Sequence, residues 1–211
     1  MKKPSFLTIG LFAISIGFLN AQTNQGKLIL SLSSDIFGLG FTTLKTISDT
    51  NGSEEASESF NVNLSPKIGY FLIDNLAIGL DLGVGLQTGN NGTYHKYTST
   101  SLSAGPFVRY YIPALKVLPF FELGGSVGMM NTKFINIDNT YGEDRVDKTG
   151  IINYGGGIGL AAPLGERVMV DVLAGYHSSS VKFSEDNENN ERLISGILGL
   201  DIGFVILLGS M

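Results

Sequence analysis

Six charged residues lie within segments that otherwise consist of apolar and small residues. An isolated charge in such surroundings is costly, whereas basic side chains and carboxylates stabilise one another through ion pairs and charge-assisted hydrogen bonds. The sequence therefore predicts one ionic network in which the two basic residues bridge the four carboxylates. The alternative is that the same side chains are separately hydrated. The six residues are Lys67, Asp81, Arg109, Glu122, Asp171 and Asp201.

A second group of residues could support hydrolysis. His177 and Ser179 share one face of an extended segment, and Glu188 or Glu191 follows, which would supply a base, a nucleophile and an orienting acid. This arrangement is similar to the His-x-Ser pair and downstream acid of lipid A deacylases. However, the Asn-Ala that follows the pair in that family is absent here. The alternation also places His177 on the lumen side, whereas the active site of those enzymes faces lipid. A lipid A-modifying hydrolase is therefore the minor alternative.

Other signals of catalysis or of cofactors are weak. The glycine run at 155–159 lacks the lysine spacing of a phosphate loop and lies inside a strand pattern. The chain has two histidines and no cysteine, and these form no cluster with metal-ligand spacing. We therefore expect no enzyme activity, no cofactor, no metal and no nucleic-acid partner.

The charged residues belong to segments with a period of two. Between Phe60 and Leu86 large apolar residues occupy nearly all even positions, and small or polar residues occupy the odd positions. This period predicts long β-strands with one apolar face. The opposite face is dominated by Gly, Ala and Ser, which suits the crowded interior of a barrel better than a surface in water. The large side chains are therefore expected to face lipid.

The same pattern predicts eight strands in the chain. The first changes phase near Ile36, which indicates a β-bulge. The second and third, between Phe60 and Leu86, meet at a turn at 73–75, and the other six span about 27–43, 97–112, 117–130, 150–162, 168–181 and 193–208. We therefore predict an all-β fold, an eight-stranded antiparallel up-and-down transmembrane β-barrel.

The N-terminus has the pattern of a secretory leader. Lys2 and Lys3 precede an apolar run at 6–18, and Ala21 ends the segment. We predict a signal peptide at 1–21 and one barrel domain at 22–211. Loss of the two lysines leaves 12 basic and 19 acidic residues, so the mature chain would carry a net charge near −7.

The connections between the strands alternate in length. Short turns are expected at 73–75, 113–116 and 163–167, and long polar loops at 45–59, 89–96, 131–149 and 182–192. Short turns at one end and long loops at the other are typical of bacterial outer-membrane barrels. This pattern predicts an integral outer-membrane protein whose two termini are periplasmic and whose long loops face outward, where they could bind an extracellular ligand.

The segment 65–79, with Pro66, Gly69, Tyr70 and Asn75 among its residues, resembles the second hairpin of the OmpA-like and porin-like eight-stranded outer-membrane barrels. The closing strand matches that family's assembly signal in part, at Gly199, Ile202 and Phe204. The resemblance implies a structural or loop-presenting barrel without catalysis. Its expected partners are outer-membrane lipids, lipopolysaccharide and the barrel-assembly machinery.

Aromatic residues cluster near the predicted membrane boundaries. They are expected to form girdles at the interface, although they could also be scattered strand aromatics. On the short-turn side they are Tyr70, Phe71, Tyr110, Tyr111, Phe120, Phe121 and Phe204. Together the patterns predict a non-enzymatic surface protein whose lumen is closed by charged residues, with a small passive pore as the alternative.

Overall fold

The computed structural model describes residues 23–35, 39–46, 55–91, 95–114, 116–136, 145–183 and 192–209. The predicted signal peptide at 1–21 lies outside these residues. In the part of the chain that is described, no helix is long and apolar enough to cross a membrane.

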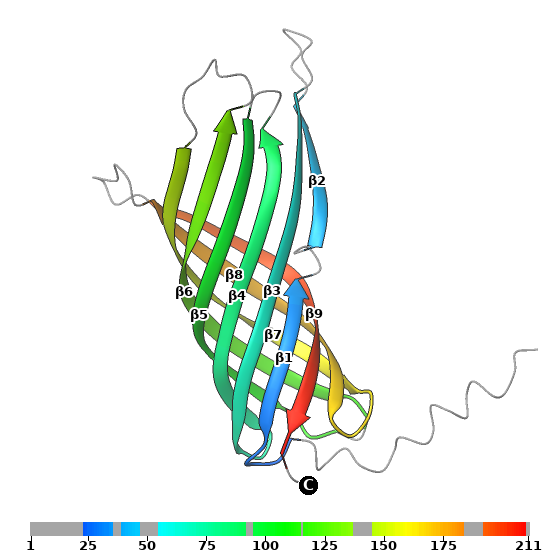
Figure 1. Ribbon diagram of the computed structural model, residues 1–211. Coiled ribbons are helices and arrows are strands. Elements are labelled where there is room, and N and C mark those ends of the chain that lie inside the picture. Colours follow the sequence, from blue (N-terminus) through cyan, green and yellow to red (C-terminus); the bar gives the residue numbers. More distant parts are fainter. Residues whose placement is uncertain are drawn as a thin grey trace, which may run out of the picture.

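The described chain forms nine antiparallel β-strands that wrap into a barrel (Figure 1). From β3 onward each strand pairs with the next along the chain, as expected for an up-and-down topology. The strands are β1 (Leu28–Asp35), β2 (Leu39–Thr46), β3 (Glu55–Ile73), β4 (Leu76–Asn91), β5 (His95–Tyr111), β6 (Leu118–Asn136), β7 (Arg145–Pro163), β8 (Val168–Phe183) and β9 (Arg192–Leu208).

The barrel is closed by β1, which pairs with β3 on one side and with β9 on the other. Because β1 and β2 both pair with β3, they are two segments of one barrel strand, and the barrel has eight strand positions. The predicted fold class, an eight-stranded antiparallel up-and-down barrel, is confirmed by this topology.

The first barrel strand changes register between its two segments. Ser33 pairs with Ser65, whereas Leu39 pairs with Val62. Six positions along the first strand therefore correspond to only three along β3, which requires extra residues on the first strand. The predicted bulge near Ile36 falls at this place, and residues 36–38 themselves lie outside the described residues.

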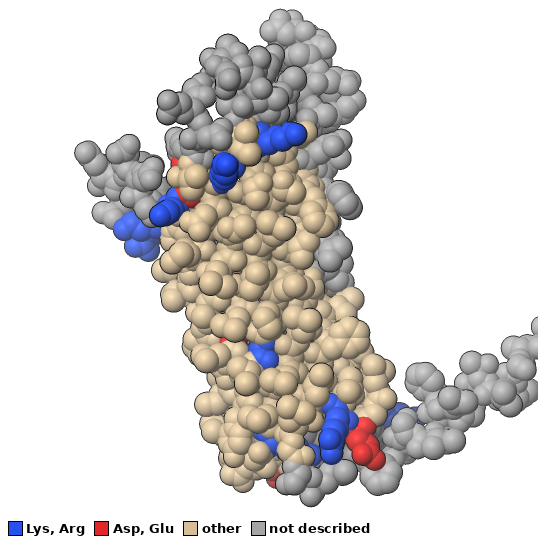
Figure 2. All heavy atoms as spheres, in the orientation of Figure 1, with Lys and Arg blue, Asp and Glu red and all other residues tan. Residues whose placement is uncertain are grey.

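The large apolar side chains point outward from the barrel wall. Leu80, Leu123 and Ile158 are 55%, 67% and 61% exposed, although each belongs to a paired strand. The wall drawn in Figure 2 is largely free of charge between its two ends, and basic residues gather toward those ends. Such a surface is stable against hydrocarbon but not against water. The predicted orientation of the alternation, with large residues outside, is therefore correct.

The short-turn end is closed by a tight hairpin and by the segment that precedes β1. The turn between β3 and β4 consists of Asp74 and Asn75, and Asn75 adopts a φ of 67°, which asparagine tolerates better than most residues. The backbone N–H of Asn75 donates a hydrogen bond to the carbonyl of Thr23 at 2.7 Å. The backbone N–H of Gln25 donates a hydrogen bond to the Asp74 carboxylate at 2.8 Å. The start and the end of the described chain both lie at this end of the barrel (Figure 1).

The strands extend farther than the sequence pattern indicates. β3 begins at Glu55, β5 at His95 and β7 at Arg145, so the predicted loops 45–59, 89–96, 131–149 and 182–192 are too long at their ends. The reason is that alternation reports contact with lipid, whereas the backbone ladder continues beyond the lipid with polar and β-branched residues such as those at 96–100. The remaining parts of these loops lie outside the described residues.

Candidate functional site

Two ion pairs in the lumen are formed by residues that lie directly opposite each other on neighbouring strands. Lys67 on β3 pairs in register with Asp81 on β4, and its Nζ lies 3.6 Å from Oδ2 of Asp81. Arg109 on β5 pairs in register with Glu122 on β6, and its Nε and Nη2 each lie 2.5 Å from Oε2 of Glu122. The registers of the two hairpins therefore bring the residues of each pair together.

Further contacts join these pairs across the barrel. Nζ of Lys67 also contacts Oε1 of Glu122, and Nη1 of Arg109 contacts Oδ2 of Asp171 on β8. Glu122 thus accepts hydrogen bonds from both basic side chains. The side chains of Arg109, Glu122 and Asp171 are only 3%, 7% and 6% exposed, so the contacts are shielded from water. We call Lys67, Asp81, Arg109, Glu122 and Asp171 the charged layer.

Asp201, the sixth residue of the predicted network, lies apart from the charged layer. Its Oδ2 is 3.2 Å from Nε2 of His177 on the neighbouring strand. No ion pair between Asp201 and the two basic residues of the layer is found among the described residues. The cause is register, because Asp171 lies opposite Gly203 and Asp201 is therefore two residues farther from the short turns. The expectation that Lys67 and Arg109 bridge all four carboxylates is thus wrong for Asp201.

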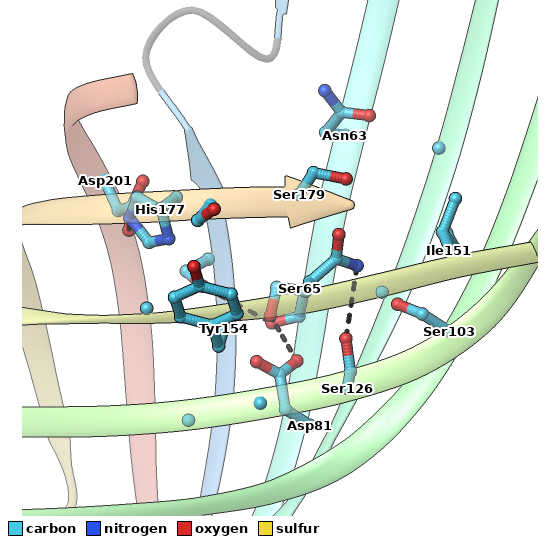
Figure 3. A pocket seen from close by; sticks show the side chains of 18 of the residues that line it. Asn63, Ser65, Asp81, Ser103, Ser126, Ile151, Tyr154, His177, Ser179 and Asp201 are labelled. Atoms are coloured by element: carbon cyan, nitrogen blue, oxygen red, sulfur yellow. Dashed lines mark hydrogen bonds and ion pairs between the residues drawn. The ribbon is translucent and has the colours of Figure 1, made fainter. Parts of the chain in front are cut away.

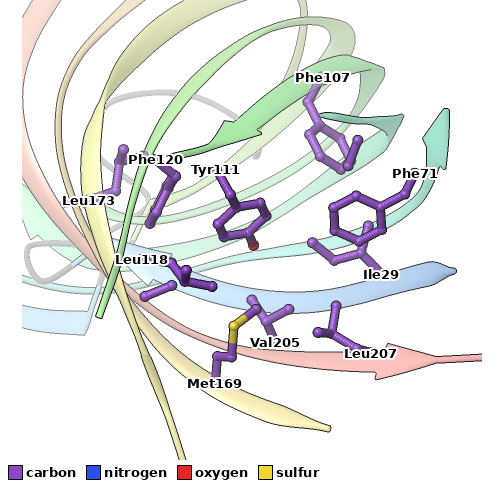
Figure 4. Close-up of a cluster of buried hydrophobic side chains, with 12 residues drawn as sticks. Ile29, Phe71, Phe107, Tyr111, Leu118, Phe120, Met169, Leu173, Val205 and Leu207 are labelled. Carbon is purple, nitrogen blue, oxygen red and sulfur yellow. The ribbon is translucent and has the colours of Figure 1, made fainter. Parts of the chain in front are cut away.

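Below the charged layer, toward the short turns, apolar side chains fill the lumen (Figure 4). Cζ of Arg109 lies 4.4 Å from the ring centroid of Phe120, and Nη1 donates a hydrogen bond to the hydroxyl of Tyr111 at 3.0 Å. The charged layer therefore rests directly on this group, which we call the apolar floor. Its members are Ile29, Phe71, Ala77, Phe107, Tyr111, Leu118, Phe120, Ala161, Met169, Leu173, Val205 and Leu207.

The apolar floor corrects the predicted aromatic girdle. Phe71, Tyr111 and Phe120 are at most 1% exposed and lie inside the barrel, whereas their neighbours Tyr70, Tyr110 and Phe121 are 43%, 43% and 50% exposed. Consecutive residues of a strand point to opposite faces, so each aromatic pair supplies one ring to each side. The small residues of the lumen make room for the inner rings, since a Cβ added to Gly159 would lie 2.3 Å from Cζ of Phe120.

Above the charged layer, toward the long loops, the lumen contains a cavity of about 330 Å³ (Figure 3). Lys67, Asp81 and Glu122 line its lower part, and serine side chains contribute much of the wall. The Ser65 hydroxyl donates to Oδ1 of Asp81, and Nδ2 of Asn153 donates to the Ser126 hydroxyl at 3.3 Å. The serines that line the cavity are Ser33, Ser65, Ser101, Ser103, Ser126, Ser178, Ser179 and Ser195.

The possible hydrolase residues lie in the same cavity. His177, Ser179 and Asp201 all line it, and Figure 3 shows His177 beside Asp201 with Ser179 farther along β8. Glu188 and Glu191, the acids considered from the sequence, lie outside the described residues. A carboxylate that orients His177 is therefore present, but it is Asp201 on β9, which sequence order alone did not indicate. In the described part of the chain no group of three His, Asp or Glu could hold a metal ion.

No family model and no curated protein matches the chain. Solved structures do match. The chain is similar to outer-membrane β-barrels. A major outer membrane protein from Thermus thermophilus has 12% identity and a TM-score of 0.49, and 87% of this chain and 99% of that one are covered. Neisserial surface protein A has 16% identity and a TM-score of 0.44, with 86% and 97% covered. OprG from Pseudomonas aeruginosa has 12% identity and a TM-score of 0.37, with 89% and 98% covered.

The resemblance to eight-stranded outer-membrane barrels that the sequence carries is confirmed at the level of the fold. The closed antiparallel ladder of the chain itself shows this architecture.

Proposed function

We propose that this protein is a non-enzymatic outer-membrane barrel that presents its loops at the cell surface and whose lumen is closed. The observation that carries the proposal is the continuous path of contacts from Lys67 through Glu122 and Arg109 to Asp171, which joins β3, β6, β5 and β8 across the lumen. The termini would be periplasmic, and the loops within 45–59, 89–96, 131–149 and 182–192 would face the medium.

Closure is supported by the position of the charged layer on the apolar floor. Any ion that passes through the barrel would have to separate buried ion pairs and then cross the tightly packed rings of Tyr111 and Phe120. Leaving one charge of a buried ion pair without its partner typically costs about 3–5 kcal/mol, so the paired, closed arrangement is favoured. The two barriers lie in series, so removal of one leaves the other in place.

Placement in the outer membrane is supported by the apolar outer wall of the barrel. An integral barrel of this kind would contact outer-membrane lipids and lipopolysaccharide and would need the barrel-assembly machinery for insertion. Where β1 pairs with both β3 and β9, the described strands form a closed ring of backbone hydrogen bonds, which is the requirement that hydrocarbon imposes.

Solute uptake into liposomes tests the closed lumen. Refolded wild type should give liposomes no more permeability to small ions than protein-free liposomes show. The Arg109→Ala/Phe120→Ala double variant removes the guanidinium and the ring beneath it, and it should increase uptake, with a preference for cations because the lumen then keeps four carboxylates against one lysine. Gln87→Ala, which shortens a lumen side chain near the mouth of the barrel, is the matched control and should leave uptake at the wild-type level.

A small passive pore is the alternative, and the cavity above the charged layer favours it, because side chains leave part of the lumen unfilled. Rapid cation uptake by wild-type liposomes would support this pore and contradict the closed barrel. The pairing of His177 with Asp201 favours the minor alternative, a lipid A-modifying hydrolase. In that case expression of the wild type, but not of Ser179→Ala, would reduce the number of acyl chains on lipid A, as measured by mass spectrometry.

A further inference from the structure

Among the described residues, the barrel that β1 closes in its lower half has a gap in the strand ladder on one side of its upper half. β1 pairs with β9 only from Leu28 and Leu208 to Asp35 and Asp201. Beyond this point β2 continues the first barrel strand, but β2 pairs with β3 alone. Among the described residues, the upper half of β9 is therefore paired with β8 on one side and has no strand on the other. Figure 1 shows β2 and the upper part of β9 diverging.

This opening begins at the depth of the membrane rather than above it. The eight residues of β1 rise about 20 Å at about 3.4 Å per residue and a tilt of about 40°, which is less than a hydrocarbon band of about 25 Å. Beside the opening, β9 still presents large apolar side chains outward, since Leu198 and Ile194 are 81% and 68% exposed. With the termini in the periplasm, as proposed above, the opening therefore begins within the outer leaflet.

Lumen-facing residues of β9 become exposed at the opening. Ile197 shares the lumen face with Asp201 and Gly203, but it is 56% exposed, whereas Leu173 on the same side of β8 is 5% exposed. Ile197 also lines the lumen cavity, together with Ser195 of β9 and Ser33 of β1. The cavity thus reaches β9 beside the opening and β1 just below it.

The chemistry of the cavity favours a positive charge. Its lining includes three carboxylates, one lysine and one histidine. Lys67 and Glu122 are 9% and 7% exposed and contact each other, whereas Asp81 and Asp201 keep 27% and 16% of their side-chain surface exposed. Serine hydroxyls elsewhere in the cavity wall present further oxygen atoms to a cationic head group.

We propose that the cavity binds the head group of a cationic amphipathic molecule that enters from the outer leaflet through the opening between β2 and β9. The head group lies against Asp81 and Asp201, and the hydrocarbon chain remains among the lipids beside Ile197. The charged layer and the apolar floor close the lumen below the cavity, so the site binds the molecule without conducting it to the other end. This inference goes beyond a structural barrel, and it does not require a pore.

The opening can be tested with single tryptophans, because the chain contains none. Ile197→Trp reports the opening, Leu198→Trp the lipid face and Ile151→Trp the cavity wall on β7. In nanodiscs of phosphatidylcholine with brominated acyl chains, the Ile197→Trp variant should lose its emission nearly as strongly as Leu198→Trp, and Ile151→Trp should keep it. If the indole of Ile197→Trp is as protected as that of Ile151→Trp, because the wall closes or because a second copy covers the edge of β9, the proposal is wrong.

The ligand class can be tested with the Ile151→Trp variant in nanodiscs of unlabelled phosphatidylcholine. A dodecyl chain that carries a quaternary-ammonium nitroxide should quench the emission of this variant in a saturable manner. A fatty acid with a nitroxide near its carboxylate, and a tailless trimethylammonium nitroxide, should each quench it much less. Equal quenching by the fatty acid would contradict the charge preference, and equal quenching by the tailless cation would show entry from water instead of lipid.

A carboxylate variant separates specific binding from partition of the probe into lipid. In the Ile151→Trp background, Asp81→Asn with Asp201→Asn should abolish the saturable part of the quenching, whereas Gln87→Ala should preserve it. A β-rich circular dichroism spectrum checks that each barrel is folded. Saturable quenching that survives in the folded Asn variant would overturn the assignment of the head-group site. If that variant does not fold, the comparison of the three probes in the protein with intact carboxylates decides whether the cavity selects a cationic head group.

Discussion

Arg109 and Glu122 lie opposite each other on β5 and β6, and Nε and Nη2 of the guanidinium both lie 2.5 Å from Oε2 of the carboxylate. This pair connects the two halves of the charged layer, because Glu122 also contacts Lys67 and Arg109 also contacts Asp171. A change at either residue should therefore affect the whole layer.

We expect Arg109→Ala to lower the free energy of unfolding by about 3–5 kcal/mol, since it leaves Glu122 and Asp171 buried without their shared cation. Urea titration of the protein in lipid vesicles, followed by circular dichroism, measures this loss. Tyr111→Phe removes only the hydroxyl that accepts from Arg109 and should cost about 1 kcal/mol. Equal stability of Arg109→Ala and wild type would mean that the layer does not stabilise the barrel.

The outward face of β6 gives a prediction on membrane depth. Leu123→Arg places a charge among the outward apolar residues of β6, about midway across the hydrocarbon band, and should destabilise the barrel by about 2–4 kcal/mol. Leu164→Arg is a matched control, because Leu164 is equally exposed, at 66% against 67% for Leu123, but lies in a short turn. The same titration compares the two variants. Similar costs at both positions would contradict the placement of the membrane.

The hairpin between β3 and β4 depends on the backbone conformation of Asn75. A β-branched residue at a φ of 67° is strained, so Asn75→Val should cost about 1–3 kcal/mol in addition to the lost side-chain hydrogen bond from the Thr23 hydroxyl. Asn75→Gly accepts this conformation and should lose only that hydrogen bond, at about 1 kcal/mol. The fraction of protein that refolds into vesicles, read from its heat-sensitive mobility on gels, follows the same order. Poorer refolding of the Gly variant than of the Val variant would argue against this turn.

The expected orientation in the cell can be checked by proteolysis. Protease added to intact cells should cut within 45–59 or 182–192, whereas trypsin should reach Arg167 in the turn between β7 and β8 only after the outer membrane is opened. Mass spectrometry of the fragments identifies the cut sites. Cleavage at Arg167 in intact cells would show that the barrel has the opposite orientation.

Much of the fold follows from alternation, because lipid contact on one face and a crowded lumen on the other require large and small residues at successive positions. The same alternation identifies the lumen charges, and Lys67 and Asp81 lie on one face of a single hairpin. It could also have identified the apolar floor, since Phe71 is two residues from Gly69 and four from Lys67 on the same face. Because consecutive residues of a strand point to opposite faces, only one member of each aromatic pair can lie at the membrane interface.

Other features could not be read from the sequence. The separation of Asp201 from the charged layer depends on the stagger between β8 and β9, which counting residues from the turns does not give. The break between β1 and β2 was indicated by the change of phase near Ile36, but its consequence for pairing with β9 requires the three-dimensional arrangement. The ends of the strands were missed because polar strands above the lipid lose the alternating pattern.

Single-channel recording in planar bilayers tests the closed lumen most directly. The account predicts that wild-type protein inserted into the bilayer gives no defined conductance steps, and that Arg109→Ala/Phe120→Ala gives cation-selective steps. Stable, cation-selective steps from the wild type, at the same protein density and voltage, would contradict a lumen closed by Lys67, Glu122, Arg109 and Asp171.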